Sequence, residues 1–264
     1  MNKTFVYLCR MEERLDKVLL QRGLVTTRTR AEEIIRVHGV LVNGKLLNKT
    51  GKKIPVDAEI ELLAEEIPFV SRGALKLKKA LESFNVSVEG KIVLDIGAST
   101  GGFTEVCLEG GAKKVFCVDV GQNQLHPKIA SDERVVNLEK THVRELNNRL
   151  ISEQCDLVVI DVSFISLEKV LPFLHPLLTK NAECIALVKP QFEVGKKNVG
   201  KGGIVKNKRL YPEVIEKIKE VGKLNHLTYV SHIDSPILGG DGNQEFLMYL
   251  KSHWTFNFEG VKLT

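Results

Sequence analysis

The chain has 264 residues, of which 43% are hydrophobic and 27% charged, the composition of a globular protein with room for one large and one small domain. Its five cysteines are widely spaced and form no C-x-x-C pair, and no apolar run approaches the ~18 residues of a membrane span. These features argue against a disulfide framework, a zinc knuckle and a membrane-spanning helix, and they predict a cytoplasmic protein.

The net charge of +5 is concentrated near the N-terminus. Residues 1–57 contain 12 basic and 6 acidic residues, whereas residues 58–264 contain 26 basic and 27 acidic residues. A compact basic module indicates a polyanionic partner, most often nucleic acid, or else a solvated basic surface, and charge alone does not choose between them. Met11 is a possible alternative start, which would make residues 1–10 a poorly ordered leader.

The first 60 residues predict two short helices and a hairpin. Glu12–Gly23 has helical periodicity and ends in a glycine, and a second helix over Thr29–His38 is expected to turn its arginines outward. Asn43-Gly44 is a strong two-residue hairpin signal after Val40–Val42. The following segment, Val56–Val70, is expected to hold a strand and then a linker that ends at Pro68.

A glycine-rich loop follows the strand Val93–Ile96 and leads into a helix that begins near Phe103. Small residues over Gly97–Gly102 let the backbone approach a ligand closely. The dinucleotide fingerprint would need a second glycine at Ser99, and instead the acidic Asp95 closes the strand. This pattern predicts a site for S-adenosylmethionine, with an ordinary turn between strand and helix as the alternative.

The rest of the chain alternates between strands and helices, as a doubly wound α/β domain does. Asp119 ends the second strand about 20 residues past the loop, where it is placed to bind a ribose, although a helix cap is the simpler interpretation of a lone aspartate. Glu139 ends the third strand, near the expected adenine. The strands expected after the loop are Lys114–Val120, Arg134–Glu139, Cys155–Asp161, Glu183–Lys189, Thr228–Asp234 and Glu245–Leu250. The expected helices are Phe103–Gly110, Leu167–Leu178 with an interruption near Pro172, and Tyr211–Val221.

Opposite charges end the fourth and fifth strands. Asp161 and Lys189 both follow buried apolar runs, so we expect them at the ligand-binding edge of the sheet, either as reacting groups or as a structural salt bridge. Burial and a second cation, for which Lys76 on the helix Ala74–Phe84 is the candidate, would favour the neutral amine that a general base requires. Glu245 is expected to orient the ammonium groups. Residues 191–206, rich in glycine and lysine, are either a lid over the substrate or a disordered connection.

Two stretches carry family resemblances. Residues 13–60, with Arg14-Leu15-Asp16, Thr27-Arg28 and Val40–Lys45, resemble the alpha-L RNA-binding motif. The segments Asp95–Thr104, Asp161–Leu167 and Val188–Glu193 resemble FtsJ-type ribose 2′-O-methyltransferases, and the whole chain resembles the TlyA family, often called hemolysins. The resemblance implies a Rossmann-like methyltransferase domain at 67–254 behind a small α+β RNA-binding domain at 11–66.

The resemblance also implies the site residues and the reaction. The family's catalytic tetrad corresponds to Lys76, Asp161, Lys189 and Glu245, in which Asp161 and Glu245 are expected to hold Lys189. The predicted cofactor contacts are Asp95, Gly97, Ala98, Ser99, Gly101, Gly102, Phe103, Asp119, Val120, Glu139 and Asp161. The predicted RNA contacts are Arg14, Arg28, Arg30, Arg36, Lys45, Lys49 and Lys52.

The expected activity is S-adenosylmethionine-dependent 2′-O-methylation of a cytidine in ribosomal RNA of the large subunit and, in some relatives, also the small subunit. No metal is expected, because the leaving thioether is neutral and the cofactor supplies the electrophile. The ribosomal subunit or its RNA is the expected partner, with no DNA and no membrane, and the sequence specifies no oligomeric state. The alternatives are a non-catalytic RNA-binding assembly factor and a membrane-active hemolysin.

Overall fold

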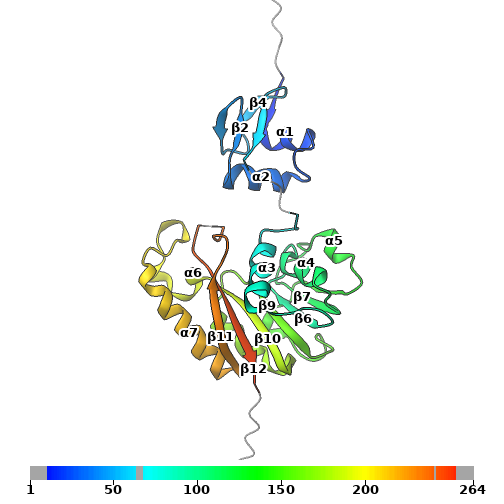
Figure 1. Ribbon diagram of the computed structural model, residues 1–264, viewed down its shortest axis with the longest axis vertical. Coiled ribbons are helices and arrows are strands. Elements are labelled where there is room, and N and C mark those ends of the chain that lie inside the picture. The colour runs from blue at the N-terminus through cyan, green and yellow to red at the C-terminus, as the bar shows by residue number, and fades with distance from the viewer. Residues whose placement is uncertain (1–10, 64–67, 241, 254–264) are drawn as a thin grey trace, which may run out of the picture. The chain divides into compact units, whose positions relative to one another are not determined.

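The structure is a computed structural model that describes residues 11–63, 68–240 and 242–253 (Figure 1). The chain forms two compact units, Met1–Pro68 and Phe69–Thr264. The leader expected at residues 1–10 and the end of the expected linker, residues 64–67, lie outside the described residues.

The first unit packs two short helices against two small sheets. Its elements are β1 (Glu12–Arg14), α1 (Leu15–Gln21), α2 (Arg28–Val37), β2 (Val40–Val42), β3 (Lys45–Leu47), β4 (Lys53–Pro55) and β5 (Ile60–Leu62). Strand β1 pairs with β4, and β2 lies between β3 and β5. Leu15, Leu19 and Ile35 are fully buried in the core between these elements.

The first helix begins later than its periodicity predicts. Glu12–Arg14 is a strand that pairs antiparallel with Lys53–Pro55, and the helix starts only at Leu15. The predicted hairpin is confirmed, since β2 and β3 pair in register across a turn in which Asn43 and Gly44 have φ of 50° and 74°. Positive φ at both turn residues is what a tight two-residue hairpin requires, and asparagine and glycine adopt it most readily.

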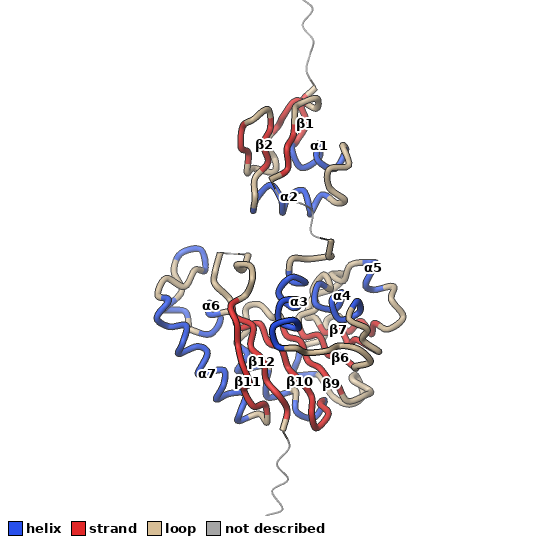
Figure 2. The backbone as a smooth tube through the Cα atoms, in the orientation of Figure 1, coloured by secondary structure: helices blue, strands red, loops and turns tan. Residues whose placement is uncertain are grey.

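The second unit is an α/β domain around a seven-stranded sheet (Figure 2). Its helices are α3 (Gly73–Phe84), α4 (Gly102–Glu109), α5 (Pro127–Ala130), α6 (Pro190–Glu193) and α7 (Tyr211–Leu224). Its strands are β6 (Ile92–Ile96), β7 (Lys114–Val118), β8 (Val135–Leu138), β9 (Cys155–Ile160), β10 (Leu178–Val188), β11 (Leu227–Asp234) and β12 (Phe246–Ser252).

The sheet has the order β11-β12-β10-β9-β6-β7-β8. The five strands from β10 to β8 are parallel, and β12 pairs antiparallel with both β10 and β11. Helix α4 packs on one face, where Thr104 reaches Asp95, and α7 covers the other face, where Ile218 joins the same core as Leu94. The doubly wound α/β class predicted from the sequence is confirmed.

Two expected segments take a different form. The segment Leu167–Leu178 is interrupted near Pro172 as expected, but the pieces are three consecutive 3-10 turns and not an α-helix, because Pro172 and Pro176 cannot continue an α-helical ladder. Residues 191–206 are an ordered series of short turns that includes α6 and an antiparallel bridge between Val199 and Val205, so the alternative of a disordered connection is wrong. Over the described ranges, the structure has no helix with the length and apolarity needed to cross a membrane.

Candidate functional site

The glycine-rich loop is shaped by contacts with the neighbouring strand ends. Gly97 has a φ of 85°, and a Cβ there would collide with the carbonyl oxygen of Asp161, so only glycine fits. Ser99 also has a positive φ of 48°, and its N–H donates to Asp119 Oδ2 at 2.8 Å. The other carboxylate oxygen of Asp119 accepts the N–H of Gly121 at 2.7 Å. Asp119 therefore fixes the loop, and each of its oxygens retains a lone pair for a further donor.

A cavity of about 320 Å³ lies beside this loop at the carboxyl ends of β6, β7 and β9. Its walls include five of the predicted cofactor contacts: Gly97, Ser99, Asp119, Val120 and Asp161. They also include residues that the sequence interpretation missed: Gln124, Thr141, His142, Val143, Ile165 and Val170. Thr141 and His142 lie just past the third strand, and this position was their only signal in the sequence. The adenine contact expected there was assigned to Glu139 instead.

Several predicted cofactor contacts build the loop without lining the cavity. The Glu139 carboxylate accepts the backbone N–H groups of Asn123 and Gln124 at 2.8 and 3.2 Å, which orders the segment after β7. Gly102 faces the segment before α3, because a Cβ there would collide with Ser71 Oγ. The other members of this group are Asp95, Ala98 and Phe103, which are buried, and Gly101.

Asp95 is a fully buried carboxyl behind the loop. Its Oδ2 accepts a hydrogen bond from Thr104 Oγ1 at 2.6 Å, and its Oδ1 has no hydrogen-bond partner within the described part of the chain. Burial raises the pKa of Asp95 to about 7, with a smaller contribution from the negative charge of Asp161 and partial opposition from the Thr104 hydrogen bond. This carboxyl is therefore poised to change its protonation state near neutral pH.

The four predicted tetrad residues form two ion pairs. Lys189 Nζ lies 2.6 Å from Asp161 Oδ1 and donates a hydrogen bond to Ser163 Oγ at 2.9 Å. Lys76 Nζ lies 2.6 Å from Glu245 Oε2, and both side chains are almost fully buried. The expectation that Glu245 holds Lys189 is therefore wrong, because the carboxylate is engaged by Lys76. Lys189 is held by Asp161 and Ser163.

The turn after β9 is fixed from α6. Glu193, which is 8% exposed, accepts hydrogen bonds from Ser166 Oγ at 2.6 Å and from the Leu167 N–H at 2.8 Å. The same turn presents Phe164, which is 92% exposed, has a φ of 64° and lines the cavity. Its ring lies 5.3 Å from that of Phe192. A large aromatic side chain held in a strained, solvent-facing position is typical of a functional site.

The protein-family comparison gives two matches. Residues 69–252 match the model of FtsJ-like methyltransferases, and residues 13–60 match the S4 domain. This chain belongs to the FtsJ-like methyltransferase family. The FtsJ-like match covers the loop, the cavity and both ion pairs, and the S4 match covers most of the first unit.

Full-length relatives share both parts. The YqxC protein of Bacillus subtilis is 45% identical over 244 residues, which is 92% of this chain and 86% of that protein. The 16S/23S rRNA (cytidine-2′-O)-methyltransferase TlyA of Mycobacterium tuberculosis is 40% identical over 240 residues, 90% of each chain. A solved Streptococcus thermophilus structure that carries a hemolysin name is 41% identical, with a TM-score of 0.74 and coverage of 93% of this chain and 90% of that one. The TlyA resemblance found in the sequence is confirmed.

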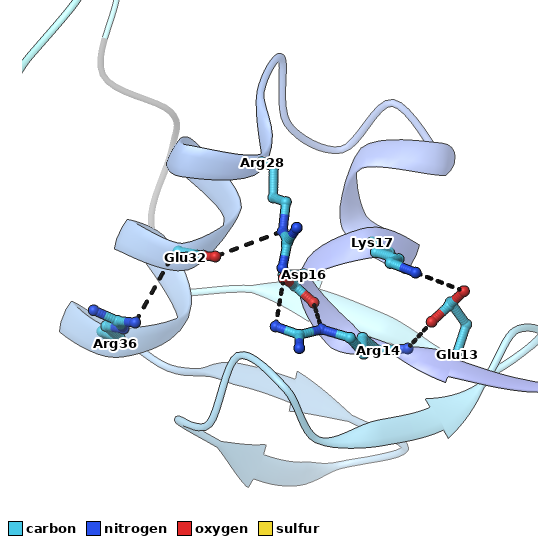
Figure 3. Close-up of polar contacts among 7 residues, drawn as sticks. All are labelled: Glu13, Arg14, Asp16, Lys17, Arg28, Glu32 and Arg36. Carbon is cyan, nitrogen blue, oxygen red and sulfur yellow. Dashed lines mark hydrogen bonds and ion pairs between the residues drawn. The ribbon is translucent and has the colours of Figure 1, made fainter. Parts of the chain in front are cut away.

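In the S4 domain, one buried carboxylate organises two arginines (Figure 3). Asp16 is fully buried, and its oxygens accept hydrogen bonds from Arg14 at 2.9 and 3.0 Å and from Arg28 at 2.8 Å. These two guanidinium groups lower the pKa of Asp16 to about 2, with the Arg14 hydrogen bond as the main cause. The arginine side chains remain 38% and 50% exposed, so they are held in place and still reach solvent.

The other predicted RNA contacts divide into exposed and buried residues. Arg36 is exposed and lies 3.6 Å from Glu32 on the same helix. The remaining exposed residues are Lys45, Lys49 and Lys52, on or beside the hairpin. Arg30 is 8% exposed, so the expectation that it points outward is wrong, because its position on α2 turns it toward the domain interior.

Proposed function

We propose that this protein transfers a methyl group from S-adenosylmethionine to the 2′-hydroxyl of a cytidine in ribosomal RNA. The observation that supports this most is the pairing of Lys189 with Asp161 at the carboxyl ends of β10 and β9, beside a cavity that also contains Asp119. Ligands of doubly wound sheets bind at this edge. The full-length relative TlyA is named for the same reaction.

The residues around the cavity fit the proposed cofactor. Asp119 retains acceptor capacity for a ribose diol, and the apolar walls from Val118, Val143 and Val170 suit an adenine. Thr141 and His142 supply polar groups at the end that lies past β8. When bound, S-adenosylmethionine supplies an electrophilic methyl group on a sulfonium that leaves as a neutral thioether.

Lys189 is the proposed proton acceptor for the ribose hydroxyl. Asp161 and Ser163 fix its Nζ from two sides, so the amine is oriented before the substrate arrives. This step requires the neutral amine, so Lys189 first releases its own proton to solvent. As the hydroxyl oxygen forms its bond to the methyl carbon, the O–H bond breaks and that proton passes to Nζ. Glu245 holds Lys76 in place through the buried ion pair, and these two residues complete the proposed tetrad.

Phe164 is the proposed platform for the acceptor nucleotide. Its ring stands almost fully exposed at the cavity, three residues after Asp161. A nucleobase that has left its helix gains about 1–3 kcal/mol by stacking on an aromatic side chain. The S4 domain supplies the affinity for structured RNA, through Arg14, Arg28 and the lysines of the hairpin.

The deciding experiment uses purified full-length protein, S-adenosylmethionine with a labelled methyl group, and ribosomal RNA and subunits from cells that lack this gene. We expect label in RNA and a new 2′-O-methylcytidine when the RNA is mapped. Lys189→Ala should reduce transfer by about 10²–10⁴-fold with cofactor affinity retained. Lys113→Ala is the matched control, because Lys113 is an exposed lysine at the amino end of β7. Binding of RNA without methyl transfer by the wild type would instead indicate an assembly factor.

A further inference from the structure

Residues 196–209, here called the basic loop, form a dense block of positive charge in the methyltransferase unit. The loop contains six basic residues and no acidic residue, whereas the other residues from 69 to 264 contain 20 basic and 23 acidic residues. It joins α6 to α7 and follows Lys189 by seven residues. An otherwise slightly acidic unit therefore concentrates its surplus positive charge in one loop, shortly after Lys189 in the chain.

The basic side chains of this loop face solvent and are not neutralised. All six are exposed, and none forms an ion pair with a residue in the described ranges: Lys196, Lys197, Lys201, Lys206, Lys208 and Arg209. Two lysines of the next helix behave differently, because Lys217 pairs with Glu168 and Lys219 pairs with Glu216. Six unpaired cations within 14 residues repel one another unless a polyanion binds them.

The basic loop has a fixed shape that Asn243 maintains. The Gly200 N–H donates to the Ile204 carbonyl at 2.8 Å, and Val199 bridges to Val205. Asn243, which is 2% exposed, accepts the Val205 N–H on Oδ1 at 3.0 Å and donates from Nδ2 to the Gly203 carbonyl at 2.9 Å. A buried amide that satisfies two backbone groups is a strong anchor.

The anchor connects the loop to the buried ion pair. Asn243 precedes Glu245 by two residues, and the Glu245 carbonyl accepts the Ser235 N–H at 2.9 Å, which closes the turn between β11 and β12. The segment between α6 and α7 lies at the same end of the sheet as the start of α4 (Figure 2). Because α4 follows β6, this is the end at which the parallel strands have their carboxyl ends. The loop is thus attached both to β10, which ends just before Lys189, and to β12, which begins just after Glu245.

We propose that the basic loop binds phosphates of the RNA strand that flanks the target nucleotide, and that Asn243 is the residue that positions this surface. This inference rests on the proposed function for its choice of RNA as the polyanion. Lysines on a shaped loop give contacts to phosphate that carry affinity and register with little sequence readout. The loop is a second RNA-binding surface, within the catalytic unit and separate in sequence from the S4 domain.

The test measures the affinity of the full-length protein for protein-free ribosomal RNA over a range of salt concentrations. For Lys201→Ala/Lys206→Ala we expect weaker binding and a slope of log affinity against log salt that is smaller by about 2. Lys113→Ala/Lys223→Ala, two exposed lysines outside the loop, should leave the slope unchanged. Cofactor affinity should be the same in all four proteins, including Asn243→Ala.

The role of Asn243 is tested by combining variants. If Asn243 acts through the loop, the two lysine substitutions should weaken RNA binding much less in the Asn243→Ala protein than in the wild type, whereas independent effects would add. An unchanged salt slope in the loop variant would overturn the proposal. So would a loss of affinity for intact subunits with full affinity for protein-free RNA, because that result assigns the loop to a ribosomal protein. Since these readouts are binding constants, they remain informative even if the wild type transfers no methyl group.

Discussion

Lys76 Nζ and Glu245 Oε2 lie 2.6 Å apart although 169 residues separate them in the chain. Lys76 is on the first turn of α3, and Glu245 immediately precedes β12, so the contact joins two distant parts of the methyltransferase unit. Both side chains are almost completely buried, with exposed fractions of 10% and 3%. In such surroundings each charge depends on the other.

Removal of one partner should cost far more than removal of both. We expect Lys76→Met to lower the free energy of unfolding by about 3–5 kcal/mol, because it leaves the Glu245 carboxylate buried without a counter-charge. Lys76→Met/Glu245→Gln should regain a large part of that loss. Urea denaturation of the single and double variants measures the coupling. Strict additivity of the two single effects would show that the pair has no energetic coupling.

Asp95 should make stability depend on pH in an unusual direction. Its pKa is about 7 in the folded protein and close to 3.8 when unfolded, so between these values the native state binds more protons than the unfolded state. Stability from this group is therefore lost as pH rises from about 4 to about 7, by at most about 4 kcal/mol in all and by about 3 kcal/mol between pH 5 and pH 8. Urea unfolding at pH 5 and pH 8 should show this loss in the wild type and a smaller one in Asp95→Asn. An equal loss in both proteins would exclude Asp95 as its source.

Phe164 should contribute to activity and not to stability. Because its φ of 64° is strained for phenylalanine and the ring is 92% exposed, we expect Phe164→Gly to leave the free energy of unfolding unchanged or up to about 1 kcal/mol higher. The same change should lower kcat/KM for RNA by about tenfold or more, with unchanged cofactor affinity, since the stacking platform is lost. Phe164→Tyr should retain most activity. Full activity of Phe164→Gly would rule out the platform.

Arg28 and Arg30 are close in sequence, but their substitutions should have different effects. Arg28 is half exposed and held by Asp16, so Arg28→Ala should weaken RNA binding and reduce the salt slope by about 1. Arg30 is buried, so Arg30→Ala should lower the thermal stability of the S4 domain and leave the salt slope as it is. Salt titrations and thermal scans of both proteins separate the two roles. A reduced slope in Arg30→Ala would place its guanidinium group on RNA.

Local sequence patterns predicted those site residues that lie at the end of a single strand. Asp119, Asp161 and Lys189 each follow a buried apolar run, and the rule that parallel strands end at one edge brought them together correctly. Gly97 was predicted from the same kind of pattern, and the structure supplies its reason in the close approach of the Asp161 carbonyl. Such predictions need only the period of a strand and the position of its last residue.

Other features depend on contacts that no local pattern contains. Glu245 meets Lys76 because β12 is inserted antiparallel between β10 and β11, and this strand order cannot be read from the order of segments. Glu12–Arg14 looks helical, but it pairs with a strand some 40 residues later. Glu139 was chosen for the adenine because it ends a strand, yet it does not line the cavity, and its carboxylate orders the segment after β7 instead.

The position of Glu245 late in the chain also determines the order in which parts of the protein can fold during synthesis. Synthesis at about 5–20 residues per second separates Lys76 from its counter-charge by roughly 10–30 s. During that interval the S4 domain has emerged and can fold. Lys76, however, cannot be buried as an ion pair until Glu245 has been synthesised. Capacity to hold RNA therefore arises before capacity to modify it, and the last strand of the sheet acts as the final step that completes the enzyme.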